Sequence, residues 1–213
     1  MIGLLQRLGL SSERCISCGK VFVGLSQGYL CDECLGSIKP IHPMDYSNRL
    51  EYVVSYRVFG KYEGVLKEIV HNMKFKNSKS LALLLGKAIR EHLWEYIEET
   101  NPDIITFPSL NLRRLWIRGF NHVEYILIGA GVPYMKVFKR SDMHKPMAFL
   151  NAEKRQRAVL GHRLKEELID FLEDKRVLVV DDLLTTGSTI QRLAYLLMSV
   201  GAQEVHAYFI ARA

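Results

Sequence analysis

The chain has 213 residues, of which 48% are hydrophobic and 24% charged, as expected for a folded protein with one ordinary domain and a small appendage. No run approaches the roughly 18 apolar residues of a membrane span, and Arg7 interrupts the N-terminal apolar stretch before a signal-peptide core can form, so we expect a cytoplasmic location. The net charge is +6, but residues 111–165 alone hold 12 Lys+Arg against 3 Asp+Glu, which predicts a polyanionic partner, a pyrophosphate group or both.

The four cysteines form two Cys-x-x-Cys pairs near the N-terminus, Cys15/Cys18 and Cys31/Cys34. This spacing lets four sulfurs reach one ion, so we predict a closed, structural Zn²⁺ site that the segment needs in order to fold. Two disulfides are the alternative in an exported protein, and a redox pair or an iron–sulfur cluster are the others. With Pro40 to Pro43 read as a linker, we divide the chain into a zinc-finger module, residues 1–43, and a second domain, residues 44–213.

The second domain begins with a predicted strand over residues 51–58 and two predicted helices over residues 65–73 and 81–97. In the connector between the helices, Lys74 and Lys76 flank an aromatic residue. The connector is either solvated or faces an anion, and the pattern alone does not separate these two interpretations.

The basic middle of the chain follows a short predicted strand, residues 103–107, which ends at Pro108-Ser109-Leu110. The run Arg118-Gly119-Phe120-Asn121 opens a predicted helix, and a further strand is predicted over residues 134–138. A long polar stretch, residues 139–165, comes next. A loop of this length inside a compact domain is usually functional or mobile.

The last part of the chain predicts a buried strand over residues 176–180, a helix from Ile190 to about Gly201 and a strand over residues 205–210. Asp181 and Asp182 follow the first of these strands, where open α/β sheets bind ligands. The hydroxyl-rich turn Thr185 to Thr189 wraps the N-terminus of the next helix, which favours a phosphate. The carboxylates must face something neutral or cationic, so a sugar phosphate satisfies the whole loop.

Strands that alternate with helices in this way predict an α/β fold with a parallel sheet flanked by helices. The stretch Asp181-Asp182-x-x-Thr185-Thr186-Gly187-x-Thr189 resembles the 5-phosphoribosyl-1-pyrophosphate (PRPP) motif of the type I phosphoribosyltransferases. The resemblance implies that Asp181 and Asp182 hold the ribose hydroxyls. It also implies that the turn from Thr185 to Thr189 holds the 5-phosphate. The residues predicted to bind PRPP are Asp181, Asp182, Thr185, Thr186, Gly187, Ser188, Thr189, Ser109 and Leu110.

The order of motifs along the whole chain resembles the ComF family, which comprises competence proteins for DNA uptake and their relatives. The features that carry the resemblance are the two Cys-x-x-Cys pairs, the run from Arg118 to Asn121, the long basic loop and the final motif. His122 stands where family members often have Gln. The resemblance implies a phosphoribosyltransferase-like fold with an N-terminal zinc finger, a cytosolic location and the handling of single-stranded DNA during natural transformation.

Single-stranded DNA needs cations for its phosphates and aromatic faces for its bases. The predicted DNA-binding residues are Arg113, Arg114, Trp116, Arg118, Phe120, Lys139 and Arg140. The competing interpretation is that the two rings belong to the core and the arginines to a solvated face.

Three functions follow from these patterns. The first is a competence protein that handles single-stranded DNA and binds PRPP. The second is an active phosphoribosyltransferase with Mg²⁺ bridging the pyrophosphate and an acceptor that the sequence does not specify. The third is a binding protein gated by PRPP. As a short exposed finger, the cysteine module would suit a helicase or a DNA-translocation protein as partner.

Overall fold

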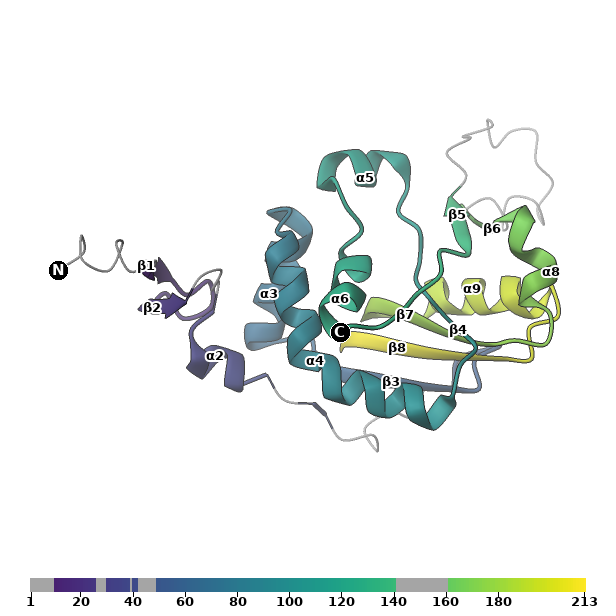
Figure 1. Ribbon diagram of the computed structural model, residues 1–213, viewed down its shortest axis with the longest axis horizontal. Coiled ribbons are helices and arrows are strands. Elements are labelled where there is room, and N and C mark those ends of the chain that lie inside the picture. The colour runs from purple at the N-terminus through teal and green to yellow at the C-terminus, as the bar shows by residue number, and fades with distance from the viewer. Residues whose placement is uncertain (1–9, 26–29, 39, 42–48, 141–160) are drawn as a thin grey trace.

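The computed structural model describes residues 10–25, 30–38, 40–41, 49–140 and 161–213. The small N-terminal module and the larger body that follows it are shown in Figure 1. The module contains β1 (Leu10–Arg14), β2 (Val21–Leu25) and α2 (Asp32–Gly36), and β1 and β2 pair antiparallel. The predicted boundary between residues 43 and 44 lies outside the described residues and stays a prediction.

The body is built on a four-stranded parallel sheet, as the sequence predicts. Its strands are β3 (Ser55–Lys61), β4 (Ile104–Thr106), β7 (Arg176–Leu184) and β8 (Glu204–Arg212), in the order β3-β8-β7-β4. Strand β7 lies inside the sheet and is buried from Val177 to Val180, which accounts for its unbroken apolar run.

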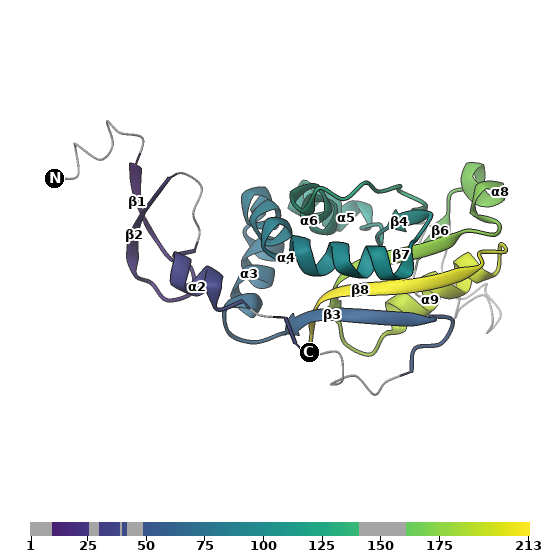
Figure 2. The same ribbon diagram turned by 60° about the horizontal axis from the view of Figure 1, so that its bottom comes forward.

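Helices cover both faces of the sheet (Figures 1 and 2). On one face lie α3 (Gly64–Phe75), α4 (Lys79–Thr100) and α6 (His122–Ala130), and on the other lies α9 (Ser188–Met198). Helices α4 and α6 approach so closely that a Cβ atom at Gly86 or Gly129 would overlap the backbone of the other helix. This close packing fixes α6, whose first residue is His122, over the end of β7.

The remaining described elements are short, and the last of them leads into the amino end of β7. They are α5 (Leu112–Arg118), β5 (Phe138–Arg140), β6 (His162–Leu164), a 3-10 helix (Glu166–Leu168) and α8 (Ile169–Leu172). Strands β5 and β6 pair antiparallel in a separate hairpin. Helix α5 stands out from the body in Figure 1, and its residues show no pattern that predicts a helix.

Two predicted strands are placed wrongly. The strand predicted over residues 51–58 begins only at Ser55, because the backbone turns at Tyr52, whose φ is +63°. The strand predicted over residues 134–138 does not join the sheet. After Pro133, which has no N–H to donate, the Met135 N–H donates to Ile105 O (2.8 Å), and the chain then leaves for the hairpin at Phe138.

The cysteine module lies beside α3, at the end of the molecule remote from the sheet, in both Figure 1 and Figure 2. Its Ile16 lines a cavity together with residues of α3 and α4, so the module and the body share a surface. Among the described residues, none of the helices combines the length and the apolar character that a bilayer crossing requires.

Candidate functional site

The turn between β7 and α9 exposes hydroxyl groups and a helix N-terminus. Strand β7 ends at Leu184, Thr185 and Thr186 are exposed, and α9 begins at Ser188, also exposed. Within the described part of the chain, no side chain accepts from the first N–H groups of α9 in a regular cap, although Thr186 Oγ1 accepts a long bond from Ser188 N–H (3.4 Å). These donors at the positive end of a helix suit an anion such as a phosphate.

Gly187 is required by the shape of this turn. It adopts the left-handed conformation (φ +77°), which residues with a side chain rarely adopt. A Cβ atom there would also overlap a methyl carbon of Leu50. The turn therefore depends on glycine for two independent reasons.

Asp182 is held by two donors from the helices on one face of the sheet. Lys74 Nζ, from the last turn of α3, lies 2.9 Å from Asp182 Oδ2, and His122 Nε2 contacts the same oxygen. Arg118 donates to His122 Nδ1 (3.4 Å), so Nε2 carries the hydrogen that His122 donates to Asp182. A chain of contacts thus runs from α5 through α6 and β7 to α3.

The two adjacent carboxyl groups are driven to opposite protonation states. Burial alone would raise the pKa of Asp182, but the hydrogen bond from His122, together with the charge and hydrogen bond of Lys74, outweighs it and holds this pKa well below its usual range. Burial and the neighbouring charge of Asp182 raise the pKa of Asp181 to about 7. Near neutral pH, Asp182 accepts hydrogen bonds while the proton on Asp181 is readily exchanged, so the pair can both accept from and donate to sugar hydroxyls.

We call Asp181, Asp182 and the turn Thr185 to Thr189 the cradle. The loop Pro108-Ser109-Leu110 leaves β4, which is the neighbour of β7, at the same edge of the sheet. The side chain of Asn121 donates to Pro108 O (2.9 Å), and His162 Nε2 donates to Ser109 O (3.0 Å). Ser109 Oγ is buried at this edge and has no hydrogen-bond partner among the described residues, an unusual arrangement that a hydrogen bond from a ligand would satisfy.

Helix α5 presents the predicted DNA-binding residues unevenly. Trp116 is 87% exposed and Arg114 is exposed, whereas Arg118 turns towards His122. The side chain of Arg113 lies outside the described part of the structure. Phe120 is only 5% exposed and its ring packs edge-on against Tyr125, so this burial does not support a stacking role.

The other two predicted DNA-binding residues lie on β5, away from α5 in the sequence. Lys139 pairs with the exposed Glu166 (3.0 Å), an arrangement that contributes little in water. Arg140 lies at the end of the same strand and makes contacts of its own. The structure thus divides the predicted set between α5 and the β5–β6 hairpin.

The end of α3 adds residues that the predicted DNA-binding set does not contain. Phe75 is 68% exposed and packs against His71, with ring centroids 4.7 Å apart, and Lys76 follows it on the surface. Asn77 Nδ2 donates to Ile117 O (2.8 Å), which ties this end of α3 to α5. We call Arg114, Trp116, Phe75 and Lys76 the α5 surface.

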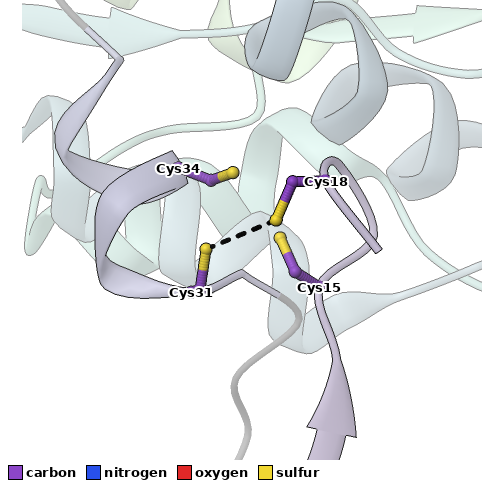
Figure 3. Close-up of side chains that lie close together, drawn as sticks. All are labelled: Cys15, Cys18, Cys31 and Cys34. Atoms are coloured by element: carbon purple, nitrogen blue, oxygen red, sulfur yellow. Dashed lines mark hydrogen bonds between the residues drawn. The ribbon is translucent and has the colours of Figure 1, made fainter. Parts of the chain in front are cut away.

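The four cysteines converge as their spacing predicts. The sulfur atoms of Cys15, Cys18, Cys31 and Cys34 all lie within 4.8 Å of one another and point towards a common centre (Figure 3). Such a group of sulfurs could hold a metal ion such as zinc.

The protonation of the cysteines also fits a cation. Burial would raise the pKa of Cys15, but hydrogen bonds from the backbone of Cys18, Cys31 and Ser17 lower it to about 6. Burial, reinforced by the other sulfurs, raises the pKa of Cys34 to about 12. Without a cation the four thiols cannot all ionise, because burial and the repulsion between neighbouring thiolates oppose it, and a divalent ion would offset that repulsion.

Sequence reasoning missed Lys74 and His122 as partners of Asp182. Lys74 is noticed only as a lysine beside an aromatic residue, and His122 only as a departure from a family pattern. Contacts across 108 and 60 residues of sequence, respectively, leave no periodic signal. The only available hint was that a buried carboxylate needs a cation or several donors.

Comparisons with known proteins agree with the resemblance seen in the sequence. Residues 129–213 match the family model described as a phosphoribosyl transferase domain. The competence protein ComFC of Streptococcus pneumoniae is 28% identical over 164 residues, which cover 75% of this chain and 69% of that protein. Competence protein F of Haemophilus influenzae is 25% identical over 225 aligned positions, covering 94% of this chain and 97% of that protein.

A solved structure, the glutamine PRPP amidotransferase from B. subtilis complexed with ADP and GMP, is 20% identical with a TM-score of 0.42. The match covers 62% of this chain and 26% of that larger one. The assignment of a phosphoribosyltransferase-type fold therefore relies on the matched domain and on the parallel sheet, with its hydroxyl-rich turn between β7 and α9.

Proposed function

Because this chain belongs to the ComF family of competence proteins and has a phosphoribosyltransferase-like fold, we propose that it handles incoming single-stranded DNA in natural transformation and binds PRPP in the cradle. In this proposal, it works in the cytosol with Zn²⁺ held by the four cysteines and Mg²⁺ accompanying PRPP. Two relatives are named competence proteins and a third a DNA utilization protein, from Escherichia coli.

The observation that carries the DNA role is the exposure of Trp116 on α5. A tryptophan that is 87% exposed has almost no protein contacts to explain its presence there. Arg114 is exposed on the same helix, and Lys76 and a second exposed ring, Phe75, lie at the end of α3, which Asn77 ties to α5. Exposed rings with surrounding cations form a stacking platform for unpaired bases.

The cradle supports the proposed PRPP site through its chemistry. An open helix N-terminus, a turn that requires glycine, and two carboxyl groups with opposed pKa shifts suit a phosphate and a pair of hydroxyls. Ser109 Oγ adds an unpartnered group on the side where a pyrophosphate would extend.

The DNA role is tested by fluorescence anisotropy with labelled oligothymidylate at several salt concentrations. We expect binding that weakens steeply as salt rises, and a loss of at least tenfold in affinity for Arg114→Glu at low salt. Lys87→Glu, which makes the same charge change on an exposed part of α4, is the matched control. Equal effects of the two substitutions would exclude the α5 surface as the DNA site.

One contact favours a second function, in which PRPP gates DNA binding. Lys74 contacts Asp182 from the last turn of α3, and the next two residues of the chain, Phe75 and Lys76, belong to the α5 surface. Ribose hydroxyls that occupy Asp182 Oδ2 would compete with Lys74 and so bias the end of α3. The two ligands would then change each other's affinity by the same factor.

Gating is tested by measuring DNA affinity with and without saturating Mg²⁺-PRPP, in wild type and in Lys74→Met. We expect a shift of about 5- to 150-fold in wild type, the usual range of such coupling, and a smaller shift in the variant. A DNA affinity that saturating PRPP leaves unchanged would contradict gating, while leaving the DNA role intact.

Phosphoribosyl transfer is the remaining alternative. It predicts pyrophosphate release from PRPP in the presence of a suitable nucleobase or amine, and loss of this release in Asp182→Asn. Calorimetry with Mg²⁺-PRPP separates the cases, because heat of binding without pyrophosphate release indicates a binding protein.

A further inference from the structure

A cavity of about 400 Å³ lies between the cysteine module and the turn that joins α3 to α4. This volume is towards the lower end of the roughly 300–1,000 Å³ of ligand pockets. Its lining residues are Ile16, Asn72, Lys76, Asn77, Ser78, Lys79, Ser80 and Leu81. Ile16 comes from the module, between Cys15 and Cys18, and the others come from the body.

The charge of this lining is purely positive. It contains Lys76 and Lys79 and no carboxylate, and neither lysine pairs with an acid in the described part of the chain. Lys79 Nζ instead lies over the rings of Tyr125 and Phe120, 5.1 and 5.8 Å from their centroids. Aromatic rings hold an ammonium group in place without neutralising it, so the charge remains available to an anion.

The rest of the lining supplies both hydrogen-bonding groups and apolar atoms. Asn72 is only 6% exposed and donates its side-chain amide to Glu68 O (2.8 Å), which leaves its side-chain oxygen as an acceptor. Ser78 caps α4, and Ser80 adds a hydroxyl near the positive end of that long helix. Ile16 and Leu81 provide the apolar atoms. This mixture suits a nucleotide, which combines a phosphate, polar edges and a flat apolar face.

The cavity is continuous with the α5 surface. Lys76 belongs to both, and Asn77, another lining residue, donates to Ile117 O of α5 (2.8 Å). A strand whose bases stack on Trp116 and Phe75 would therefore reach the cavity by following the chain of α3 into the turn.

We propose that this cavity is a second subsite for single-stranded DNA, which binds the backbone phosphate of a nucleotide that neighbours those stacked on the α5 surface. The inference rests on the proposed DNA role and deepens it. It also assigns a task to the metal module beyond its own folding, because Ile16 forms a wall of the subsite.

Salt dependence tests the lysines directly. For single-stranded DNA, each neutralised phosphate adds about 0.7 to the slope of log K against log salt. We expect Lys76→Gln/Lys79→Gln to lower the slope for oligothymidylate by about 1.4 relative to wild type. Lys67→Gln/Lys87→Gln, two exposed lysines of the same helices, is the control with equal net charge.

The results distinguish failure of the DNA role from failure of the subsite alone. If wild type shows no salt-dependent binding, the DNA role itself fails. If wild type binds and both double variants behave alike, the subsite fails while the DNA role stands. Should Lys79→Gln disturb the packing on Phe120 and Tyr125, the exposed Lys76→Gln alone keeps the test open, with an expected decrease of about 0.7.

Ile16 tests the part played by the module. Ile16→Glu places a carboxylate opposite the lysines, whereas Ile16→Gln changes size and polarity in nearly the same way without charge. With zinc content equal in both proteins, we expect DNA affinity at low salt to fall at least fivefold further for Ile16→Glu than for Ile16→Gln. Equal affinities of the two variants would show that Ile16 of the cysteine module does not contact the bound DNA.

Discussion

The cradle and the α5 surface carry groups for similar ligands but are built in opposite ways. In the cradle, Asp182 of β7 is buried, and its two side-chain partners come from two other elements, α3 and α6. On the α5 surface, Trp116 and Phe75 are largely exposed and few contacts fix them. The difference teaches that the cradle is part of what holds the body together, whereas the α5 surface can change without consequence for the fold.

The strongest test of this contrast is Asp182→Ala. It removes the acceptor of Lys74 and His122, whose side chains are 17% and 4% exposed. Leaving a buried charge without its partner destabilises a protein by about 3–5 kcal/mol, and we expect a value in this range from urea unfolding at pH 7. Asp103→Ala is the control, because Asp103 is 41% exposed where it pairs with the Arg176 side chain and accepts the Arg176 backbone N–H (2.8 Å), and its loss should cost at most about 2 kcal/mol.

The effect of Asp182→Ala should also depend on pH. Since the folded protein holds the pKa of Asp182 below its usual range, its contribution is complete above the unfolded pKa, near 3.9, and is lost as the pH falls below it. The difference between wild type and variant should therefore shrink in acid. A difference that stays constant from pH 7 down to pH 3 would show that the carboxylate does not stabilise the fold through its charge.

Asp181→Asn should act in the opposite direction. The folded protein raises the pKa of Asp181 to about 7, so wild type loses stability as the pH rises from about 4 to 7, where only the unfolded chain has released the proton. We expect the variant to match wild type below pH 4 and to exceed it above pH 7, by at most about 4 kcal/mol. Unfolding curves at pH 4, 6 and 8 measure this, and a gap that does not grow with pH would contradict it.

Gly187→Ala should have a smaller effect on stability, because it changes the turn without removing a buried charge. The left-handed conformation costs a residue with a side chain about 1–3 kcal/mol, and the overlap with Leu50 adds to this. Gly119→Ala is the matched control, since Gly119 has a similar φ of +70° and open space around it. Unfolding free energies of the two variants give the cost of the overlap by difference; equal values would mean that Leu50 moves aside freely.

The same contrast explains what the sequence could predict. The sheet and the cradle follow from strong local patterns: the apolar run before Asp181, the hydroxyl-rich turn and the helical period from Ile190. Even here, β7 continues to Leu184, because pairing with β8 extends past the carboxylates to Arg212. The partners of Asp182 could not be predicted, since α3 and α6 meet β7 only through the tertiary packing.

The α5 surface was harder to predict for a different reason. In a short helix whose Leu115, Trp116 and Ile117 are all exposed, the apolar residues carry no amphipathic period, so the sequence does not reveal the helix. Composition suggested that Trp116 and Phe120 act together, yet only Trp116 is exposed and Phe120 packs into the core. Phe120 is buried because α6, the next helix, packs against it through Tyr125, and this tertiary contact is not visible in the sequence of the basic run.

Trp116→Ala should leave stability almost untouched and still weaken DNA binding. Because its ring is 87% exposed, we expect the unfolding free energy to change by no more than about 0.5 kcal/mol. Loss of one base–aromatic stack costs about 1–3 kcal/mol in binding, which corresponds to about a 5- to 150-fold weaker affinity for oligothymidylate. Trp116→Phe keeps a ring and should retain most of the affinity. If Trp116→Ala binds as wild type does, the exposed ring is not a stacking platform. If Trp116→Ala lowers the unfolding free energy by several kcal/mol, the α5 surface stabilises the fold as the cradle does, and the two regions do not differ in this respect.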